Sequence, residues 1–145
     1  MNSLRTRSIA LLMTVLLLGL PVTVLADMVV VANPKSGVER LSVEDVINIF
    51  MGRYRELPGS IPALPVDLPA SDPVRERFYQ RLVGKDLAQI NAYWARLVLS
   101  GRTMPPLRME GAEEAIRYVA THRGAVAYLE RPKADARVRI VLELP

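Results

Sequence analysis

Ser71 and Asp72 stand directly before a proline, where the sequence changes from an apolar strand pattern to a helix pattern. The first backbone N–H groups of a helix lack intrahelical partners, so a Ser or Asp oxygen can accept from them, and so can a bound anion. Pro73 suits the first turn because the N–H that it lacks would have been unpaired. An ordinary helix cap and an oxyanion site are both open at this corner.

Arg75 is the basic residue nearest to this corner. A cation in the first turn of a helix opposes the helix dipole by about 0.3 to 1 kcal/mol, and a nearby anion would relieve that cost. Arg77 and Arg81 follow on the same helix, four residues apart, where like charges repel unless they are paired or solvated. A solvated helix face and an anion contact at Arg75 are therefore the two interpretations.

Residues for nucleophilic or transition-metal chemistry are scarce. The chain has no Cys and one His, His122, at the end of a predicted helix, where a cation interacts favourably with the last carbonyls. A transition-metal site would have to rest on carboxylates and on Met104 and Met109. We therefore expect no metal and no other cofactor.

Paired carboxylates occur twice, at Glu44 and Asp45 and at Glu113 and Glu114. Each pair falls in the first turn of a predicted helix, where negative charge stabilises the helix. The sequence also lacks a glycine-rich phosphate loop of the P-loop or dinucleotide type. These observations predict a protein that is not an enzyme.

Residues 1–26 have the pattern of a secretory signal peptide. Arg5 and Arg7 precede an apolar run, residues 9–20, and cleavage is expected after Ala26. A retained membrane anchor is the alternative, but the run is shorter than the ~20 residues that a spanning helix needs. We expect a periplasmic or secreted product without a retained anchor.

Removal of this segment leaves residues 27–145, which we expect to form a single domain. A chain of this size buries roughly 65% of its unfolded surface and needs no disulfide. The net charge falls from +4 to +2 because Arg5 and Arg7 leave with the signal peptide. The remaining basic residues are scattered, so no nucleic-acid partner is expected.

The hydrophobic pattern predicts four strands and four helices in residues 27–145. Strands are expected at 28–32, 63–66, 125–129 and 138–144. Helices are expected from Ser42 to Gly52, over 73–83, from Asp86 through Val98 and over 112–121. The segments 53–62 and 100–111 are predicted to be loops.

Three of these elements carry specific expectations. The first helix should bury one apolar face, made of Val43, Val46, Ile47 and Phe50, and Trp94 should anchor the third helix in the core. Pro65 indicates that its strand lies at an edge or leaves its donor side unpaired. In the last strand, Val138, Ile140, Leu142 and Leu144 alternate with Arg139, Val141 and Glu143, which is typical of a half-exposed antiparallel edge strand.

Strands separated by helices indicate an α/β layer structure. In parallel sheets of this class, ligands lie beyond the carboxyl ends of the strands. The loop after the first strand, which carries Asn33 and Ser36, and the corner at Ser71 are therefore expected to be neighbours.

Several phrases resemble the periplasmic phosphate ABC transporter substrate-binding proteins, which have the type 2 periplasmic-binding fold. They are VVVAN, LSVEDVINIFMGRYREL, PVDLPASDPVRERFY, AYW and HRGAVAYLE. The resemblance covers nearly all of residues 27–145 but about one of the two lobes of such receptors. It implies a single three-layer α/β lobe, with a mixed sheet of about four or five strands flanked by about four helices.

The resemblance also implies a ligand-binding set. In the family, a Ser-Gly-Thr phrase holds phosphate at the helix start. Ser71 matches the Ser of this phrase, whereas Asp72 and Pro73 replace its Gly and Thr. The Arg of the family phrase falls near Asp67. A carboxylate about 4 Å from phosphate costs several kcal/mol even at an effective dielectric near 20. We expect a weakened or lost phosphate site, with the ligand-binding set Ser71, Asp72, Arg75, Asn33 and Ser36.

Two functions follow as hypotheses. The first is a secreted, non-enzymatic, solute-binding-like module with a weak oxyanion ligand, in which tight binding needs a second lobe from another chain. The alternative is a protein-interaction or sensory accessory domain without a small ligand, which would use the proline-containing loop from Met104 to Met109 or the last strand.

Overall fold

The structure is a computed structural model that describes residues 27–145. The predicted signal peptide, residues 1–26, lies outside the described residues. Within the described range, no helix has the length and apolar character needed to cross a membrane.

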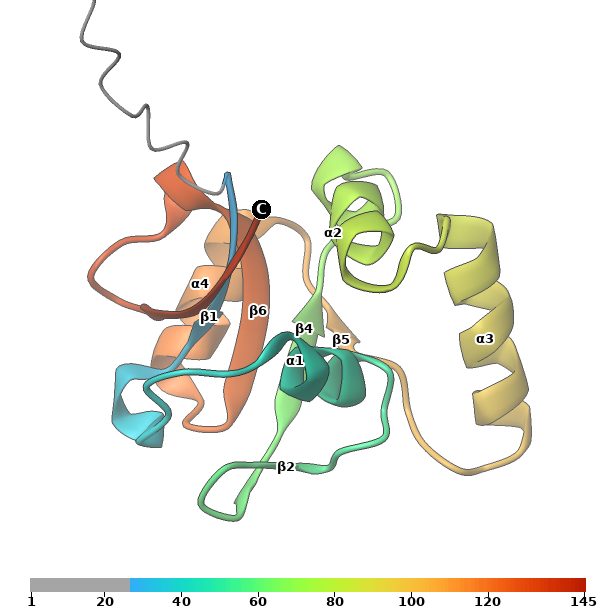
Figure 1. Cartoon of the computed structure of the whole chain (residues 1–145), viewed down its shortest axis with the longest axis horizontal. Helices are drawn as coiled ribbons and strands as arrows, with labels where there is room; N and C mark the ends of the chain where they lie inside the picture. The colour runs from blue at the N-terminus through green and yellow to red at the C-terminus, as the bar shows by residue number, and fades with distance from the viewer. Residues whose placement is uncertain (1–26) are drawn as a thin grey trace, which may run out of the picture.

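Five strands of the described chain form one mixed sheet in the order β5-β4-β6-β1-β7 (Figure 1). β1 pairs antiparallel with both β6 and β7, whereas β4 pairs parallel with both β5 and β6. A two-stranded hairpin, β2 and β3, lies in the first predicted loop. The strands are β1 (Met28–Ala32), β2 (Glu56–Leu57), β3 (Ile61–Pro62), β4 (Leu64–Asp67), β5 (Leu107–Arg108), β6 (Ala125–Glu130) and β7 (Arg139–Leu144).

Four α-helices lie around this sheet within residues 27–145. They are α1 (Val43–Phe50), α2 (Pro73–Val83), α3 (Leu87–Leu99) and α4 (Ala112–Thr121), and the 3-10 turns are η1 (Pro34–Ser36) and η2 (Arg131–Lys133). Capping boxes start α1 and α3, at Ser42 with Asp45 and at Asp86 with Gln89. The predicted α/β class, with a five-stranded mixed sheet and four helices, is confirmed.

The apolar face of α1 differs from the prediction. Val43 is 45% exposed, and Ile49 is buried instead, beside Val46 and Phe50. These three residues form an i, i+3, i+4 stripe, and the ring of Phe50 packs edge-on against Phe78 at 5.0 Å. The prediction thus holds for Val46 and Phe50, and Ile47 also packs against the core, whereas Val43 is wrong and Ile49 was missed. The exact face could not be predicted because the direction from which α2 approaches is a tertiary property.

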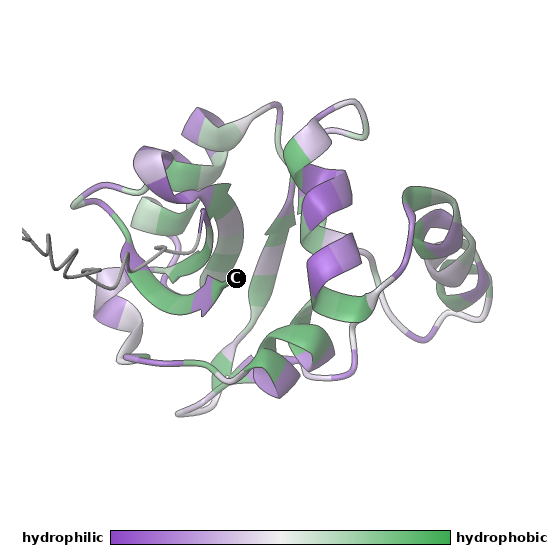
Figure 2. Cartoon of the chain, turned by 45° about the horizontal axis from the view of Figure 1, so that its top comes forward, coloured by the Kyte–Doolittle hydropathy of each residue, from purple (hydrophilic) through white to green (hydrophobic). Residues whose placement is uncertain are grey.

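Aromatic packing ties α1, α2 and β6 together. Phe78 of α2 stacks on Tyr128 of β6 with ring centroids 3.8 Å apart, and Tyr79 packs edge-on against Phe78. All five residues of β1 are buried, as expected for a strand that is covered on both faces. Hydrophobic colour follows the central strands, and hydrophilic bands alternate along α2 (Figure 2).

The structure supports the second alternative for Pro65, an unpaired donor side, and corrects the predicted alternation of the last strand at one residue. β4 lies inside the sheet, but β5 pairs only with Val66 and Asp67, so Pro65 has no strand partner on that side. β7 is an antiparallel edge strand as predicted, yet a register shift between Val30 and Val31 leaves Val141 as a bulge residue that is buried. The carbonyl of Val141 accepts a hydrogen bond from Leu41 N, so the loop between η1 and α1 covers part of this edge.

α3 stands on the far side of α2 from β6 and β1 (Figure 1). Its buried side chains are Ile90 and Trp94, which confirms the predicted anchor role of Trp94. Gly52 has a positive φ and lies so close to the Trp94 ring that a Cβ there would be 2.8 Å from it. Val98 and Leu99, at the end of α3, are exposed.

Candidate functional site

The carboxylate of Asp67, at the end of β4, is buried and accepts four hydrogen bonds. Its Oδ2 accepts from Arg75 Nε at 3.0 Å and from the Tyr79 hydroxyl at 3.1 Å. Its Oδ1 accepts from Leu68 N at 2.9 Å and from the Tyr128 hydroxyl. Asp67 is 3% exposed and Arg75 is 2% exposed, so the ion pair is buried.

The elements around Asp67 explain why these donors converge. Arg75 and Tyr79 are four residues apart and therefore share one face of α2. Tyr128 comes from β6, which pairs with β4. The guanidinium of Arg75 also lies over the Tyr79 ring at 5.3 Å from its centroid, which adds a cation–π contact.

The two phenols remain proton donors at ordinary pH. Burial raises the pKa of Tyr79 well above its usual value, and the nearby negative charge of Asp67 raises it further. The pKa of Tyr128 is raised for the same two reasons. Both hydroxyls are therefore held in the form that donates to Asp67.

The sequence allowed two interpretations of Arg75, a solvated helix face or a contact with an anion. The structure shows a buried contact in which Asp67 of the same chain is the anion. Arg77 and Arg81 are on the exposed side of α2. Arg81 binds the Asp27 carboxylate and lowers its pKa. Nη2 of Arg77 lies 3.3 Å from Oε1 of Glu130. The repulsion between the two arginines is thus reduced by acidic partners.

The corner at Ser71 is an occupied helix cap. Asp72 is the N-cap residue of α2, and its Oδ1 accepts from Val74 N at 2.9 Å. Ser71 is exposed beside it. The acidic side chain therefore takes a backbone donor that an anion would use.

Asn33 and Ser36 lie at the other end of the sheet from this corner. Because β1 runs antiparallel to β6 while β4 runs parallel to it, the end of β1 lies near the start of β4. Asn33 Nδ2 donates to the carbonyls of Val119 and Ala120, at the end of α4. Ser36 Oγ accepts from Val38 N at 3.1 Å. The structure does not bring these two residues to the Ser71 corner.

A cleft of about 670 Å³ lies beside the Asp67–Arg75 pair. Its other walls are α3, with Trp94 and Val98, and the segment that leads into β5. Two buried side-chain nitrogens of the described chain lack a hydrogen-bond partner, Arg75 Nη1 and Trp94 Nε1, and both residues line this cleft. The cleft therefore combines apolar walls with unused donors.

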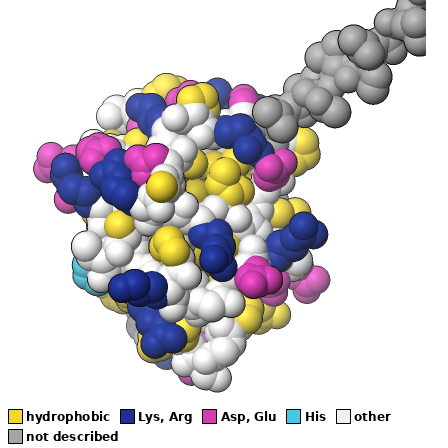
Figure 3. Space-filling model, turned by 90° about the vertical axis from the view of Figure 1, so that its left-hand side faces the viewer, with side chains coloured by type: hydrophobic (Ala, Val, Ile, Leu, Met, Phe, Trp, Pro, Cys, Tyr) yellow, Lys and Arg dark blue, Asp and Glu magenta, His cyan; other side chains and the backbone are white. Residues whose placement is uncertain are grey.

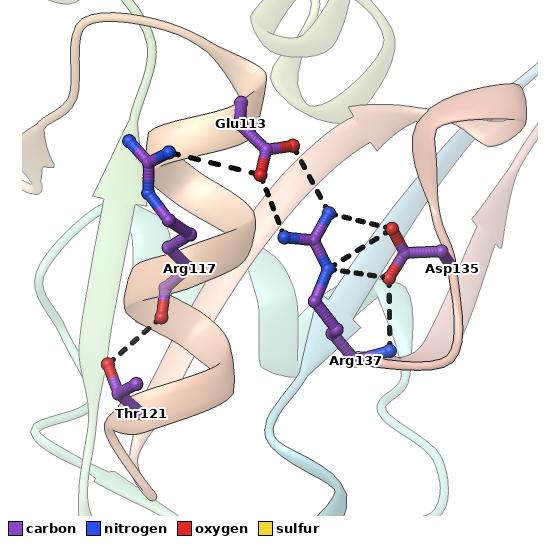
Figure 4. A network of polar contacts seen from close by, with 5 residues as sticks. All are labelled: Glu113, Arg117, Thr121, Asp135 and Arg137. Atoms are coloured by element: carbon purple, nitrogen blue, oxygen red, sulfur yellow. Dashed lines mark hydrogen bonds and ion pairs between the residues drawn. The ribbon is translucent and has the colours of Figure 1, made fainter.

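A separate ion-pair network lies on the surface at α4 (Figure 4). Arg137 binds both Glu113 and Asp135, and these hydrogen bonds lower the pKa of Glu113 and lower that of Asp135 to about 2. Basic and acidic side chains lie side by side at several places on this side of the molecule (Figure 3). This network links α4 to the turn before β7, which is a structural role.

Within residues 27–145, no group of three or more His, Cys, Asp or Glu residues is placed to hold a metal ion. His122 Nδ1 lies 2.9 Å from the Tyr118 carbonyl, and its ring stacks on Tyr118 at 3.7 Å. His122 thus contacts the last turn of α4.

Sequence reasoning noted Asp67 only as a residue of unexpected charge and did not find Tyr79 or Tyr128 as partners. A usable signal was present, because an acid at a strand end is followed eight residues later by a basic residue in the next helix. Tyr128 could be assigned only once the order of β4 and β6 was known.

Several solved structures have a similar fold, and a phosphate transport receptor is among them. An ABC-type phosphate transport receptor from Vibrio cholerae matches 80% of this chain and 45% of its own length, with a TM-score of 0.64 and 16% identity. A putative phosphate ABC transporter substrate-binding protein with bound phosphate, from Clostridium perfringens, matches 80% of this chain and 44% of its own length, with a TM-score of 0.62 and 14% identity. PstS from Borrelia burgdorferi matches 82% of this chain and 48% of its own length, with a TM-score of 0.62 and 11% identity.

These matches establish the fold, and the predicted resemblance is confirmed at that level. The chain spans a little under half the length of each of these three structures. No protein-family model matches the sequence, and no curated protein matches it.

Proposed function

We propose that residues 27–145 form a secreted, non-enzymatic binding module with the fold of a phosphate receptor but without a phosphate site. In this proposal, residues 1–26 are removed on export to the periplasm or the outside of the cell. The single observation that carries the proposal is the position of the Asp67 carboxylate. It takes three side-chain donors and one backbone donor beyond the carboxyl end of β4.

The geometry opposes phosphate capture at this end of the sheet. The charge of Arg75 is already balanced by Asp67. A phosphate near the start of α2 would also face the carboxylate of Asp72, and like charges about 4 Å apart repel by several kcal/mol at an effective dielectric near 20. Of the expected ligand set, Ser71, Asp72 and Arg75 belong to one end of α2, and Asn33 and Ser36 do not.

Phosphate titration tests the proposal directly. A receptor with a dissociation constant near 10 μM would gain about 4 kcal/mol at about 10 mM phosphate, which raises the thermal midpoint by roughly 10 °C or more. We expect a shift below about 1 °C for the purified protein. The Ser71→Ala variant should respond in the same way, and a large shift that is lost in this variant would refute the proposal.

The exposed apolar side chains near the end of α3 favour a second candidate function, a protein-interaction domain. Leu99 is 89% exposed, Met104 is 76% exposed and Leu107 is 51% exposed. They lie in or beside the proline-containing loop that the sequence indicated. A photo-crosslinking residue at position 104 should trap one defined partner in cells, and the same residue at Tyr54, a second exposed site, should not.

A further inference from the structure

The cleft beside Asp67 holds two buried donors that the described chain leaves unused. Arg75 Nη1 and Trp94 Nε1 have no acceptor within residues 27–145, although both side chains are more than nine-tenths buried. Buried donors in folded proteins are nearly always paired, because an unpaired one loses its bonds to water without replacement. A ligand that brings an acceptor to either nitrogen would remove that loss.

The charges in the cleft favour a ligand with a single negative charge. Asp67 is balanced by Arg75 through the Nε side of the guanidinium, which leaves Nη1 for another acceptor. Arg108 lines the same cleft and adds one positive charge. One carboxylate compensates this charge, whereas a phosphate dianion would exceed it.

The walls favour a ligand with an apolar body. Val98, Leu99, Pro105 and Pro106 are among the residues that line the cleft. The volume of about 670 Å³ lies within the range of roughly 300 to 1,000 Å³ that is typical of small-molecule sites. Free phosphate has no apolar part with which to use these walls.

We infer that this cleft binds a small organic acid, a carboxylate on an aromatic or branched aliphatic body. The carboxylate accepts from Arg75 Nη1 or Trp94 Nε1, and the body packs on Val98 and Pro105. Both nitrogens are buried in the described chain, so binding requires a shift of α3, whose buried side chains are Ile90 and Trp94. The inference deepens the proposed function, because it names a ligand class for the same end of the sheet.

Trp94 is the one tryptophan of the sequence, so its fluorescence reports directly on the cleft. The purified protein is titrated with phenylacetate and 4-methylpentanoate, and with phenylacetamide and inorganic phosphate as comparisons. We expect saturable fluorescence changes with both carboxylates, at dissociation constants below about 1 mM. Phenylacetamide should bind about tenfold more weakly, because it replaces a charge-assisted hydrogen bond with a neutral one.

Variants outside the Asp67 pair test the location of the site. Arg108→Gln should weaken phenylacetate binding by up to about fivefold, the range for a solvent-exposed ion pair. Val98→Glu should abolish binding, because it places a second carboxylate at an apolar wall. Arg96→Gln is the matched control, since it removes a cation from α3 at a residue outside the cleft lining, and it should leave binding unchanged.

The outcomes separate this inference from the proposed function. Absence of a saturable signal up to about 10 mM for both carboxylates overturns the inference, as does equal affinity for phenylacetamide. Both results leave the proposed function intact if phosphate also fails to bind. Phosphate binding that depends on Ser71 overturns the proposed function instead.

Discussion

Replacing Asp67 with Asn is the most informative change to the buried network. The substitution keeps the size of the side chain and removes its charge. The amide can still accept from one or two donors, but its NH2 group then faces Arg75 Nε or a tyrosine hydroxyl, which are donors themselves. Arg75, 2% exposed, is left as a buried cation without its counter-ion.

The expected loss is about 3 to 5 kcal/mol, the cost of breaking a buried ion pair by removing one partner. A domain of this size has an unfolding free energy of roughly 6 to 18 kcal/mol, so this loss is a large fraction of the total. With a denaturant slope near 2 kcal/mol per molar urea, the unfolding midpoint should fall by about 2 M.

Urea denaturation followed by circular dichroism and by Trp94 fluorescence measures this loss. Asp72→Asn is the matched control, because it removes a carboxylate five residues away at a position where Asn caps a helix as well as Asp does. The control should lose less than about 1 kcal/mol. If Asp67→Asn unfolds within about 0.5 M urea of the unmodified protein, the ion pair does not stabilise the fold as argued.

Two further predictions concern the Asp67 network, and a third concerns the surface network at Arg137. Asp67→Ala opens a space between Arg75 and the phenols of Tyr79 and Tyr128. About 50 mM formate should fill this space and raise the thermal midpoint of the variant by several degrees, while the midpoint of the unmodified protein stays unchanged. Equal shifts in the two proteins would contradict the role of the Asp67 carboxylate. Tyr79 and Tyr128 have raised pKa values in the folded state, so they keep their protons above about pH 10, where the unfolded chain loses them. The free energy of unfolding should therefore fall above this pH by up to about 2.7 kcal/mol per pH unit. Urea titration across that range measures the fall, and Tyr54→Phe is the control. Arg137 lowers the pKa of Asp135 to about 2, so the small contribution of Asp135 to stability is present above the ordinary aspartate pKa and is lost as the pH falls towards 2. Arg137→Gln should raise the pKa values of Asp135 and Glu113, measured by carboxyl NMR titration. An unchanged pKa of Asp135 would contradict the contact.

Helix boundaries were predictable because local residues determine them. Pro73 and Gly84 bracket α2, and the capping boxes at Ser42 and Asp86 begin α1 and α3. These signals act over three or four residues and need no knowledge of the rest of the fold.

The direction of strand pairing was not predictable in this way, and the site depends on it. The expectation that Asn33 lies near Ser71 assumed parallel strands, but β1 runs antiparallel to its neighbours. The bulge at Val141 and the two-residue strand β5 likewise depend on partners distant in sequence. The pairing of Asp67 with Tyr128 joins residues 61 positions apart, so periodicity could not reveal it.

The bulge in β7 has a consequence for association of this molecule with copies of itself. An outer strand with regularly spaced amide and carbonyl groups can template a further strand, and repeated addition leads to fibrous aggregates. Here the carbonyl of Val141 is already bonded to Leu41 N, and the pleat is interrupted at that residue. Deleting one residue at the bulge would make the pairing pattern of β7 continuous. The bulge therefore protects the molecule against ordered polymerisation through this edge strand.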